Sequence, residues 1–268
     1  MKEPNLNHYP KSQTIQWIDL DTEEAFDKNV DSVMGKSIMD ALGWTKESFS
    51  YQFDELGFRN PPGILGSAHY LALGCSFTMG VGLSNTQTWP HILAEKLGVQ
   101  VYNAGQGGAA GDTVFRVGRY MIPNYKPDGV FVLVPPKTRF EIVSNEFYNG
   151  IPTIFAPSEY TQEEFELLTR TLTGEWFQYV HDEKNRLALE QICNINGIPY
   201  VEITLNETPD FHYRFKVTDF ISKSTKDFKG KLARDLEHPG TYWQDGVAKM
   251  MFERWENHAL VRHLDDKP

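Results

Sequence analysis

The sequence predicts an α/β fold in which a mostly parallel central sheet lies between two layers of helices. Short apolar runs of strand length recur along the chain, at 69–73, 99–103, 130–134 and 199–205. Such runs, bounded by turns, are typical of strands that are buried on both faces. Helical patterns follow or separate these runs, and this alternation is typical of a parallel sheet. We therefore expect a three-layer α/β/α domain that also carries an N-terminal extension and inserted loops.

The size and charge of the chain narrow the possible classes. A chain of 268 residues suits one α/β domain with elaborations. Its net charge of −10 argues against a protein that binds nucleic acids or anionic membranes in general. The two cysteines, Cys75 and Cys193, form neither a disulfide framework nor a metal-ligand spacing. We expect both thiols to be reduced core residues, and we expect no cofactor.

The N-terminus and the apolar runs bear on location. Residues 1–10 are polar and lack the apolar core of a signal peptide. No run approaches the roughly 18 apolar residues of a membrane helix. The expectation is a cytoplasmic protein.

The chain divides into two parts before and after the first core strand. Residues 1–66 are expected to form an N-terminal extension packed on the core, and 67–268 the α/β domain, with an insertion at about 142–174. Within the extension, residues 32–42 predict a helix, with Ser32 as its N-cap and Gly43 as its stop. The insertion is rich in aromatic residues and turns, and its expected role is to line a pocket or act as a lid.

The stretch 71–82 organises the chain. An apolar strand breaks at Gly74, Ser76 follows almost at once, and a helical segment begins near residue 88. A strand, a sharp turn and a helix together present a serine hydroxyl above an α/β sheet. Helical N–H groups near such a turn stabilise a developing negative charge. The alternative interpretation is a turn with no chemical role.

A second pattern lies near the C-terminus. Asp235 and His238 are three residues apart, just before a helical pattern over 241–257. This spacing places both side chains on one side of a loop. The histidine is then a candidate general base, and the aspartate fixes its tautomer.

Three blocks together resemble the SGNH (GDSL-like) hydrolase family, in its bacterial or phage form. The blocks are Gly74-Cys75-Ser76-Phe77-Thr78, Asn103-Ala104-Gly105-Gln106-Gly107-Gly108, and Asp235 to His238. A Leu-Gly-Phe-Arg phrase at 56–59 precedes the first block, as in many such proteins. The resemblance implies a flavodoxin-like strand order and ester hydrolysis through an acyl-serine.

The same resemblance implies the roles of single residues. Ser76 is the expected nucleophile, His238 its base and Asp235 the residue that orients His238. The N–H groups of Ser76 and Gly105 are expected to hold the oxyanion, with Asn103 beside them. Arg59 is either a clamp for a substrate carboxylate or a surface or ion-paired residue.

One block of the family is absent. The family's Gly-x-Asn-Asp block supplies an oxyanion donor after the third strand, whereas this strand runs into Pro135-Pro136-Lys137-Thr138-Arg139. Loss of one such donor costs about a hundred- to a thousandfold in rate. Either Arg139, Lys137 or Thr138 substitutes, or the enzyme is slow, or the site binds without turnover. Arg139 is the substrate-binding candidate we favour.

Several functional interpretations remain open. The main one is a serine hydrolase acting on a small-molecule or glycan ester, and the alternatives are an inactive binding module and an O-acyltransferase that uses the same site. The spacing Gly105-x-Gly107-x-x-Ala110 also fits a dinucleotide fingerprint, but the acid Asp128 precedes the next strand instead of ending it. The lysine-bearing segment 206–232 is expected to be a solvated loop.

Two long helices are predicted in the second half of the chain. One covers 175–196, where Trp176, Val180 and Leu187 recur at helical spacing, followed by Ala188, Ile192 and Ile195. We expect this stripe to face the core. A further helix, at 161–172, opens on a capping box within the insertion.

Overall fold

A computed structural model gives the structure of residues 6–67, 69–142, 153–154, 163, 175–208 and 232–265. The helix expected at 161–172, most of the insertion at 142–174 and most of the segment 206–232 lie outside these residues. Among the helices so described, none is both long enough and apolar enough to cross a membrane.

The centre of the molecule is a four-stranded parallel sheet. Its strands are β3 (Tyr70–Leu73), β4 (Val101–Asn103), β5 (Gly129–Val134) and β8 (Tyr200–Thr204), in the order β4-β3-β5-β8. All three neighbouring pairs are parallel. The α/β prediction is confirmed, and each predicted strand is present with its ends moved by one or two residues.

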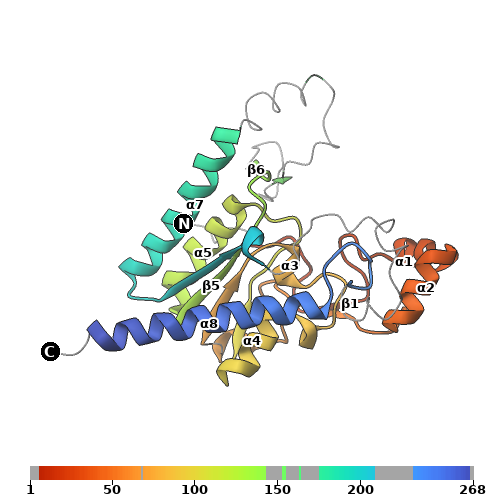
Figure 1. Cartoon of the computed structure of the whole chain (residues 1–268), viewed down its shortest axis with the longest axis horizontal. Helices are drawn as coiled ribbons and strands as arrows, with labels where there is room; N and C mark the ends of the chain where they lie inside the picture. The colour runs from red at the N-terminus through yellow and green to blue at the C-terminus, as the bar shows by residue number, and fades with distance from the viewer. Residues whose placement is uncertain are drawn as a thin grey trace.

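Helices cover both faces of this sheet (Figure 1). On one face α5 (Gly111–Tyr125) packs against α7 (Glu175–Ile195), and on the other α4 (Trp89–Leu97) packs against α8 (Thr241–Asp265). The predicted three layers are therefore present. The remaining short elements of the α/β part are α3 (Ser76–Met79), η1 (Ile64–Gly66), η2 (Asn85–Gln87), η4 (Leu205–Glu207), β6 (Glu141–Ile142) and β7 (Thr153–Ile154).

Side chains that alternate between the two faces of each strand divide the hydrophobic core into two clusters, one on each face of the sheet. In β5, Val130, Val132 and Val134 belong to the cluster that includes Val117 of α5, whereas Phe131 and Leu133 belong to the cluster on the α4 and α8 side. Successive side chains of a strand point to opposite faces, so a run that is apolar throughout supplies both layers.

The strand order creates a switch point. From β3 the chain first adds β4 on one side of β3 and later β5 on the other. Ligands of open α/β sheets bind outside the carboxyl ends of the strands at such a point. The turn that carries Ser76 follows β3 directly, so the fold places it there.

The N-terminal segment forms two helices and a small antiparallel pair of strands. The helices are α1 (Glu23–Asp31) and α2 (Val33–Leu42), and the strands are β1 (Thr14–Ile15) and β2 (Tyr51–Gln52). The Ser32 side chain accepts a hydrogen bond from the Gly35 N–H, and Gly43 ends α2 in the left-handed conformation, as predicted.

The predicted core stripe of α7 is wrong at four of its six positions. Only Ala188 and Ile192 are partly buried, and Ile192 packs against the core. Trp176, Val180, Leu187 and Ile195 are all exposed, and Trp176 is 77% accessible. The buried positions are instead Gln178, Asn185, Leu189 and Cys193, which also recur at helical spacing. Two of these are polar, so the apolar pattern indicated the wrong face. Asn185 is buried because its amide donates to Asp112 Oδ1 of α5 at 3.1 Å.

Gln244 ties three helices together beside the switch point. This side chain of α8 is 1% exposed. Its Oε1 accepts a hydrogen bond from the Trp89 N–H, the first of α4, at 2.8 Å, and its Nε2 donates to the Phe77 carbonyl of α3 at 3.1 Å. One amide thus fixes the helix that begins at Ser76 relative to α4 and α8.

We expect Gln244→Met to lower the free energy of unfolding by about 1–3 kcal/mol, because the buried Trp89 N–H loses its acceptor. Urea unfolding followed by circular dichroism measures the change. Gln100→Met is the control, because Gln100 is exposed, and it should change stability by no more than about 0.5 kcal/mol. Equal effects of the two variants would contradict this assignment.

Candidate active site

The Ser76 turn depends on a close approach that only glycine permits. A Cβ at Gly74 would lie 2.0 Å from Thr78 Oγ1 and 2.8 Å from the Leu133 carbonyl oxygen. The chain therefore turns sharply after β3, and Ser76 becomes the first residue of the short helix α3. The first N–H groups of a helix have no partner within it. No hydrogen bond to the Ser76 hydroxyl exists among the residues that the structure describes.

Arg59 fixes the other end of α3. Its guanidinium donates to the carbonyls of Met79, at 3.0 Å, and of Gly80 and Leu83. Burial lowers the pKa of Arg59 to about 10, so the group stays charged at neutral pH. The residue is only 1% exposed, which leaves no room for a substrate. Neither predicted role fits, because Arg59 is a buried residue whose partners are backbone carbonyl groups and not a carboxylate.

Asp235 and His238 form a buried pair. The His238 Nδ1 lies 2.5 Å from Asp235 Oδ2. The other oxygen, Oδ1, accepts the N–H groups of Glu237 at 3.1 Å and of His238 itself at 3.0 Å. The carboxylate therefore holds the ring and its own loop at once. With Nδ1–H on the carboxylate, Nε2 carries the lone pair that a general base needs.

Two contacts join this loop to the Ser76 turn. The His238 ring packs edge-on against Phe77, with ring centroids 5.5 Å apart and planes at 79°. The Arg234 N–H donates to the Gly82 carbonyl, a few residues beyond α3, at 2.8 Å. Since Phe77 directly follows Ser76, the His238 ring lies against the residue next to the predicted serine.

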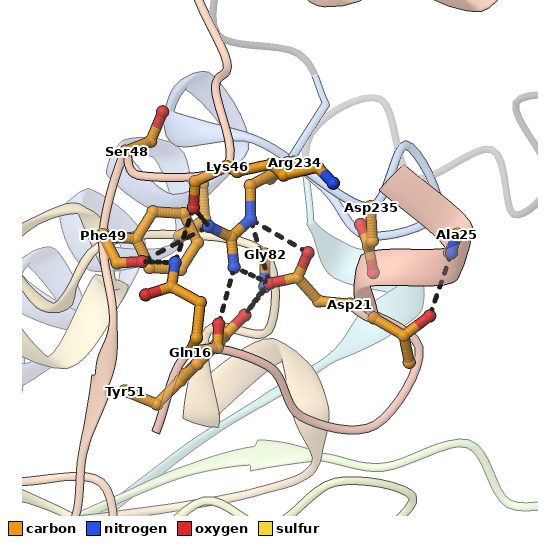
Figure 2. A network of polar contacts seen from close by, with 12 residues as sticks. Gln16, Asp21, Ala25, Lys46, Ser48, Phe49, Tyr51, Gly82, Arg234 and Asp235 are labelled. Carbon is orange, nitrogen blue, oxygen red and sulfur yellow. Dashed lines mark hydrogen bonds and ion pairs between the residues drawn. The ribbon is translucent and has the colours of Figure 1, made fainter. Parts of the chain in front are cut away.

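The Arg234–Gly82 contact is part of a closed ring of polar contacts (Figure 2). The Arg234 guanidinium pairs with Asp21, with Nη2 2.6 Å from Oδ2. Tyr51 donates its hydroxyl hydrogen to the same Asp21 oxygen, and it accepts the Gly82 N–H at 2.8 Å. The Gly82 carbonyl completes the ring by accepting the Arg234 N–H. Three segments far apart in sequence thereby fix one another.

The remaining guanidinium hydrogens of Arg234 are also used. Nη1 donates to the carbonyls of Lys46 at 3.0 Å and Phe49 at 3.3 Å, and Nη2 donates to the Gln16 carbonyl at 3.0 Å. The guanidinium lies between the rings of Trp17 and Phe49, about 4 Å from each centroid. Every one of these partners comes from the N-terminal segment, so that segment encloses the residue directly before Asp235.

The two N-terminal helices also pack on the loop itself. Leu232 and Leu236 share an apolar cluster with Phe26 of α1 and with Ile38 and Met39 of α2. Leu236 has a φ of 59°, a conformation that a branched side chain rarely adopts unless its surroundings impose it. The geometry of the Asp235–His238 loop thus depends on the N-terminal segment.

The predicted oxyanion residues Asn103 and Gly105 contact each other. The Gly105 N–H donates to Asn103 Oδ1 at 3.0 Å, and the Asn103 amide donates to the Thr78 carbonyl at 2.9 Å. Asn103 is buried, and its N–H donates to Asn60 Oδ1 at 3.0 Å. Asn103 therefore braces the second block against α3. An oxyanion role for the Gly105 N–H requires that it leave Asn103.

Arg139 lies at the edge of the same region. It is half-buried, and its Nη1 is 3.5 Å from the Ala109 carbonyl oxygen. Its backbone N–H donates to the Pro136 carbonyl at 3.1 Å, which closes the turn after β5. Lys137 and Thr138 are exposed. Of the three candidates, Arg139 alone is partly buried, and it contacts Ala109, the residue that follows the second block.

The sequence analysis missed the residues that hold the site together. Asp21, Arg234 and Tyr51 had no predicted role. The only feature of the sequence that pointed to one of them is that Arg234 directly precedes Asp235, the first residue of the third block. Within the described chain, no group of three or more His, Cys, Asp or Glu side chains is arranged to hold a metal ion. Cys75 and Cys193 are both buried and free, as predicted.

Comparison with known proteins finds likeness in structure alone. No protein-family model and no curated protein matches the sequence. Among solved structures, a putative lipolytic protein of the G-D-S-L family from Desulfitobacterium hafniense DCB-2 is 16% identical, with 69% of this chain and 95% of that chain covered and a TM-score of 0.32. The psychrotrophic esterase EstA from Pseudoalteromonas sp. is 13% identical over 70% of this chain and 98% of that chain, with a TM-score of 0.35.

A GDSL-like lipase from Bacteroides thetaiotaomicron VPI-5482 is 14% identical, over 71% of this chain and 88% of that chain, with a TM-score of 0.29. These values describe a distant likeness in the path of the chain. Identities this low do not transfer an activity.

We expect Asp21→Asn to lower the free energy of unfolding by about 3–5 kcal/mol, because it leaves the buried charge of Arg234 without its counter-ion. Urea unfolding measures the change. Asp40→Asn is the matched control in the same segment, since Asp40 pairs with Lys36 on the surface, where both side chains are more than half exposed. That substitution should change stability by less than about 0.5 kcal/mol. Similar losses in both variants would refute the role of the buried pair.

Proposed function

We propose that this chain is a serine hydrolase of the SGNH type that cleaves an ester through an acyl-serine intermediate. The observation that carries the proposal is the buried Asp235–His238 pair packed against Phe77, directly beside Ser76. A serine on a sharp turn after a parallel strand, next to a histidine held by a carboxylate, is the arrangement that acyl transfer requires.

The proposed reaction has two halves. Ser76 Oγ attacks the ester carbonyl carbon while His238 Nε2 takes the hydroxyl proton. The tetrahedral intermediate collapses, the bond to the alcohol oxygen breaks, and His238 returns the proton to the leaving alcohol. Water then attacks the acyl-serine with the same base, and the carboxylic acid leaves as Ser76 regains its proton. Asp235 keeps the imidazole oriented and stabilises its charged form throughout.

The oxyanion requires donors near the start of α3. The N–H of Ser76, at the first position of that helix, is the donor that the turn best supports. The Gly105 N–H is a second candidate, provided that it gives up its hydrogen bond to Asn103 and donates to the oxyanion instead. The Arg139 side chain is a third. The proposal keeps the family resemblance while allowing for the absent Gly-x-Asn-Asp block.

Cys75 is a poor alternative nucleophile. It is adjacent to Ser76, but it is fully buried and belongs to the apolar cluster that α4 and α8 form against the sheet. Buried thiols in apolar surroundings are unreactive.

Labelling with a fluorophosphonate probe, followed by peptide mass spectrometry, tests the nucleophile. We expect an adduct on Ser76, no adduct in Ser76→Ala, and a large loss of labelling rate in His238→Ala. Cys75→Ala is the control and should be labelled at the rate of the unsubstituted protein. A folded protein that takes no adduct would refute the proposal and favour a binding module. If labelling succeeds, product analysis with an added alcohol distinguishes hydrolysis from acyl transfer.

We expect Asp235→Asn to lower the labelling rate by about two to four orders of magnitude, because an amide does not stabilise the charged imidazole and favours the wrong tautomer. Circular dichroism controls for folding, since Asp235 also accepts two backbone N–H groups. A variant that folds normally and labels at an unchanged rate would remove Asp235 from the mechanism.

A further inference from the structure

The N-terminal segment brings a second carboxylate, Asp19, to the edge of the proposed active site. The second block is joined to the Ser76 turn, because the Ala104 N–H donates to the Ala72 carbonyl at 2.8 Å and the Gln106 N–H donates to the Gly74 carbonyl at 3.1 Å. Gly107 is the next residue, and Asp19 lies directly on it. Asp19 is therefore close to the turn that presents Ser76.

The contact at Gly107 is too close for any side chain. A Cβ there would lie 1.9 Å from Asp19 Oδ2 and 2.2 Å from the Tyr9 hydroxyl oxygen. The Tyr9 hydroxyl lies 2.5 Å from Asp19 Oδ2 and donates its hydrogen to it. A glycine at 107 thus lets the N-terminal segment press a tyrosine–carboxylate pair against the second block.

The backbone at Asp19 is held in an unusual conformation. Its φ is 49°, in a tight turn closed by hydrogen bonds between the backbones of Ile18 and Asp21. Non-glycine residues in this region are enriched at functional sites, where the surroundings impose them. The next acid in this turn, Asp21, belongs to the buried ring around Arg234. One turn therefore supplies Asp21, which supports the site, and Asp19, which lies at its edge.

The carboxylate of Asp19 retains an unused acceptor. Oδ2 accepts from Tyr9, whereas Oδ1 has no hydrogen-bond partner among the described residues, and Asp19 is exposed to solvent. Surrounding protein raises the pKa of Asp19 through desolvation. The Tyr9 hydrogen bond and the charges of His8 and His238 act in the opposite direction, and the charge of Asp235 adds to the rise. Asp19 is thus within electrostatic range of the proposed catalytic pair but is separate from it.

We propose that Asp19 Oδ1 accepts a hydrogen bond from a hydroxyl on the alcohol part of the ester, which makes esters of polyhydroxy alcohols the preferred substrates. The inference rests on the proposed function. In that mechanism His238 protonates the leaving alcohol. Asp19 lies two residues before Asp21, whose partner Arg234 directly precedes Asp235, so the turn that carries Asp19 is joined to the loop that carries His238. An anionic alcohol is disfavoured there by both Asp19 and Asp235.

Competition against fluorophosphonate labelling of Ser76 tests this without requiring fast turnover. The measured quantity is the concentration of ester that halves the labelling rate. Glycerol monoacetate and propyl acetate are the first pair, matched in chain length and different in hydroxyl groups. We expect glycerol monoacetate to protect the unsubstituted protein at a concentration about tenfold lower, the effect of one hydrogen bond to a charged group.

The variants then assign the preference. Asp19→Ala should remove it, and Asp19→Asn, which keeps a neutral acceptor, should reduce it to about threefold. Tyr9→Phe should retain the preference, because it removes only a donor to Oδ2. Asp31→Ala, which removes an exposed acid of the same segment, is the matched control and should change nothing. If Asp19→Ala fails to fold, Asp19→Asn decides the question.

Each remaining result has one meaning. No Ser76 adduct in the unsubstituted protein refutes the proposed function, and the inference with it. An adduct without any preference for glycerol monoacetate, or a full preference retained in the folded Asp19 variants, overturns the inference alone. Acetylcholine and 3,3-dimethylbutyl acetate form a second pair. An Asp19-dependent preference confined to that pair would show a cation site and would also overturn the hydroxyl proposal.

Discussion

The buried ion pair between Arg234 and Asp21 is the constraint on which the rest of the candidate site depends. Both side chains are inaccessible to solvent, so each charge is tolerated only because the other is present. The ring that includes Tyr51 and Gly82 extends this pair to the segment after α3. Removal of either charge leaves the other buried without a counter-ion, and it removes a contact that holds the loop carrying Asp235.

This dependence explains why the N-terminal segment is an integral part of the site. The strand ends of the parallel sheet provide the Ser76 turn, but they provide no packing surface for the loop that carries Asp235 and His238. Helices α1 and α2 supply that surface through the cluster around Leu232 and Leu236. The turn at 18–21 then brings Asp19 to Gly107 while Asp21 enters the buried ring. Support of the proposed chemistry and recognition of the proposed substrate therefore come from one short segment.

The oxyanion side of the site is held by contacts to α3. Arg59 and Asn103 satisfy carbonyl groups of α3 and of its C-terminal end, and in doing so they fix the short helix that begins at Ser76. The same Asn103 occupies the Gly105 N–H. Rigid support of the nucleophile thus competes with a free second donor. This competition, together with Pro135 and Pro136 in place of the expected block, makes the Ser76 N–H the central donor of the proposal.

The sequence alone determined the strands, the glycine at the turn after the first core strand and the Asp235–His238 spacing, because these can be recognised without knowledge of distant contacts. Strand runs and caps are local, and a three-residue spacing already sets where two side chains of a loop can meet. It also predicted a turn that presents the Ser76 hydroxyl above an α/β sheet. Only the tertiary structure decided the partners of buried polar groups, because these partners come from segments far apart in the sequence. Asp21 and Arg234 are such a pair, and the buried face of α7 was chosen by Asn185 reaching Asp112, a polar contact that no hydrophobic pattern records.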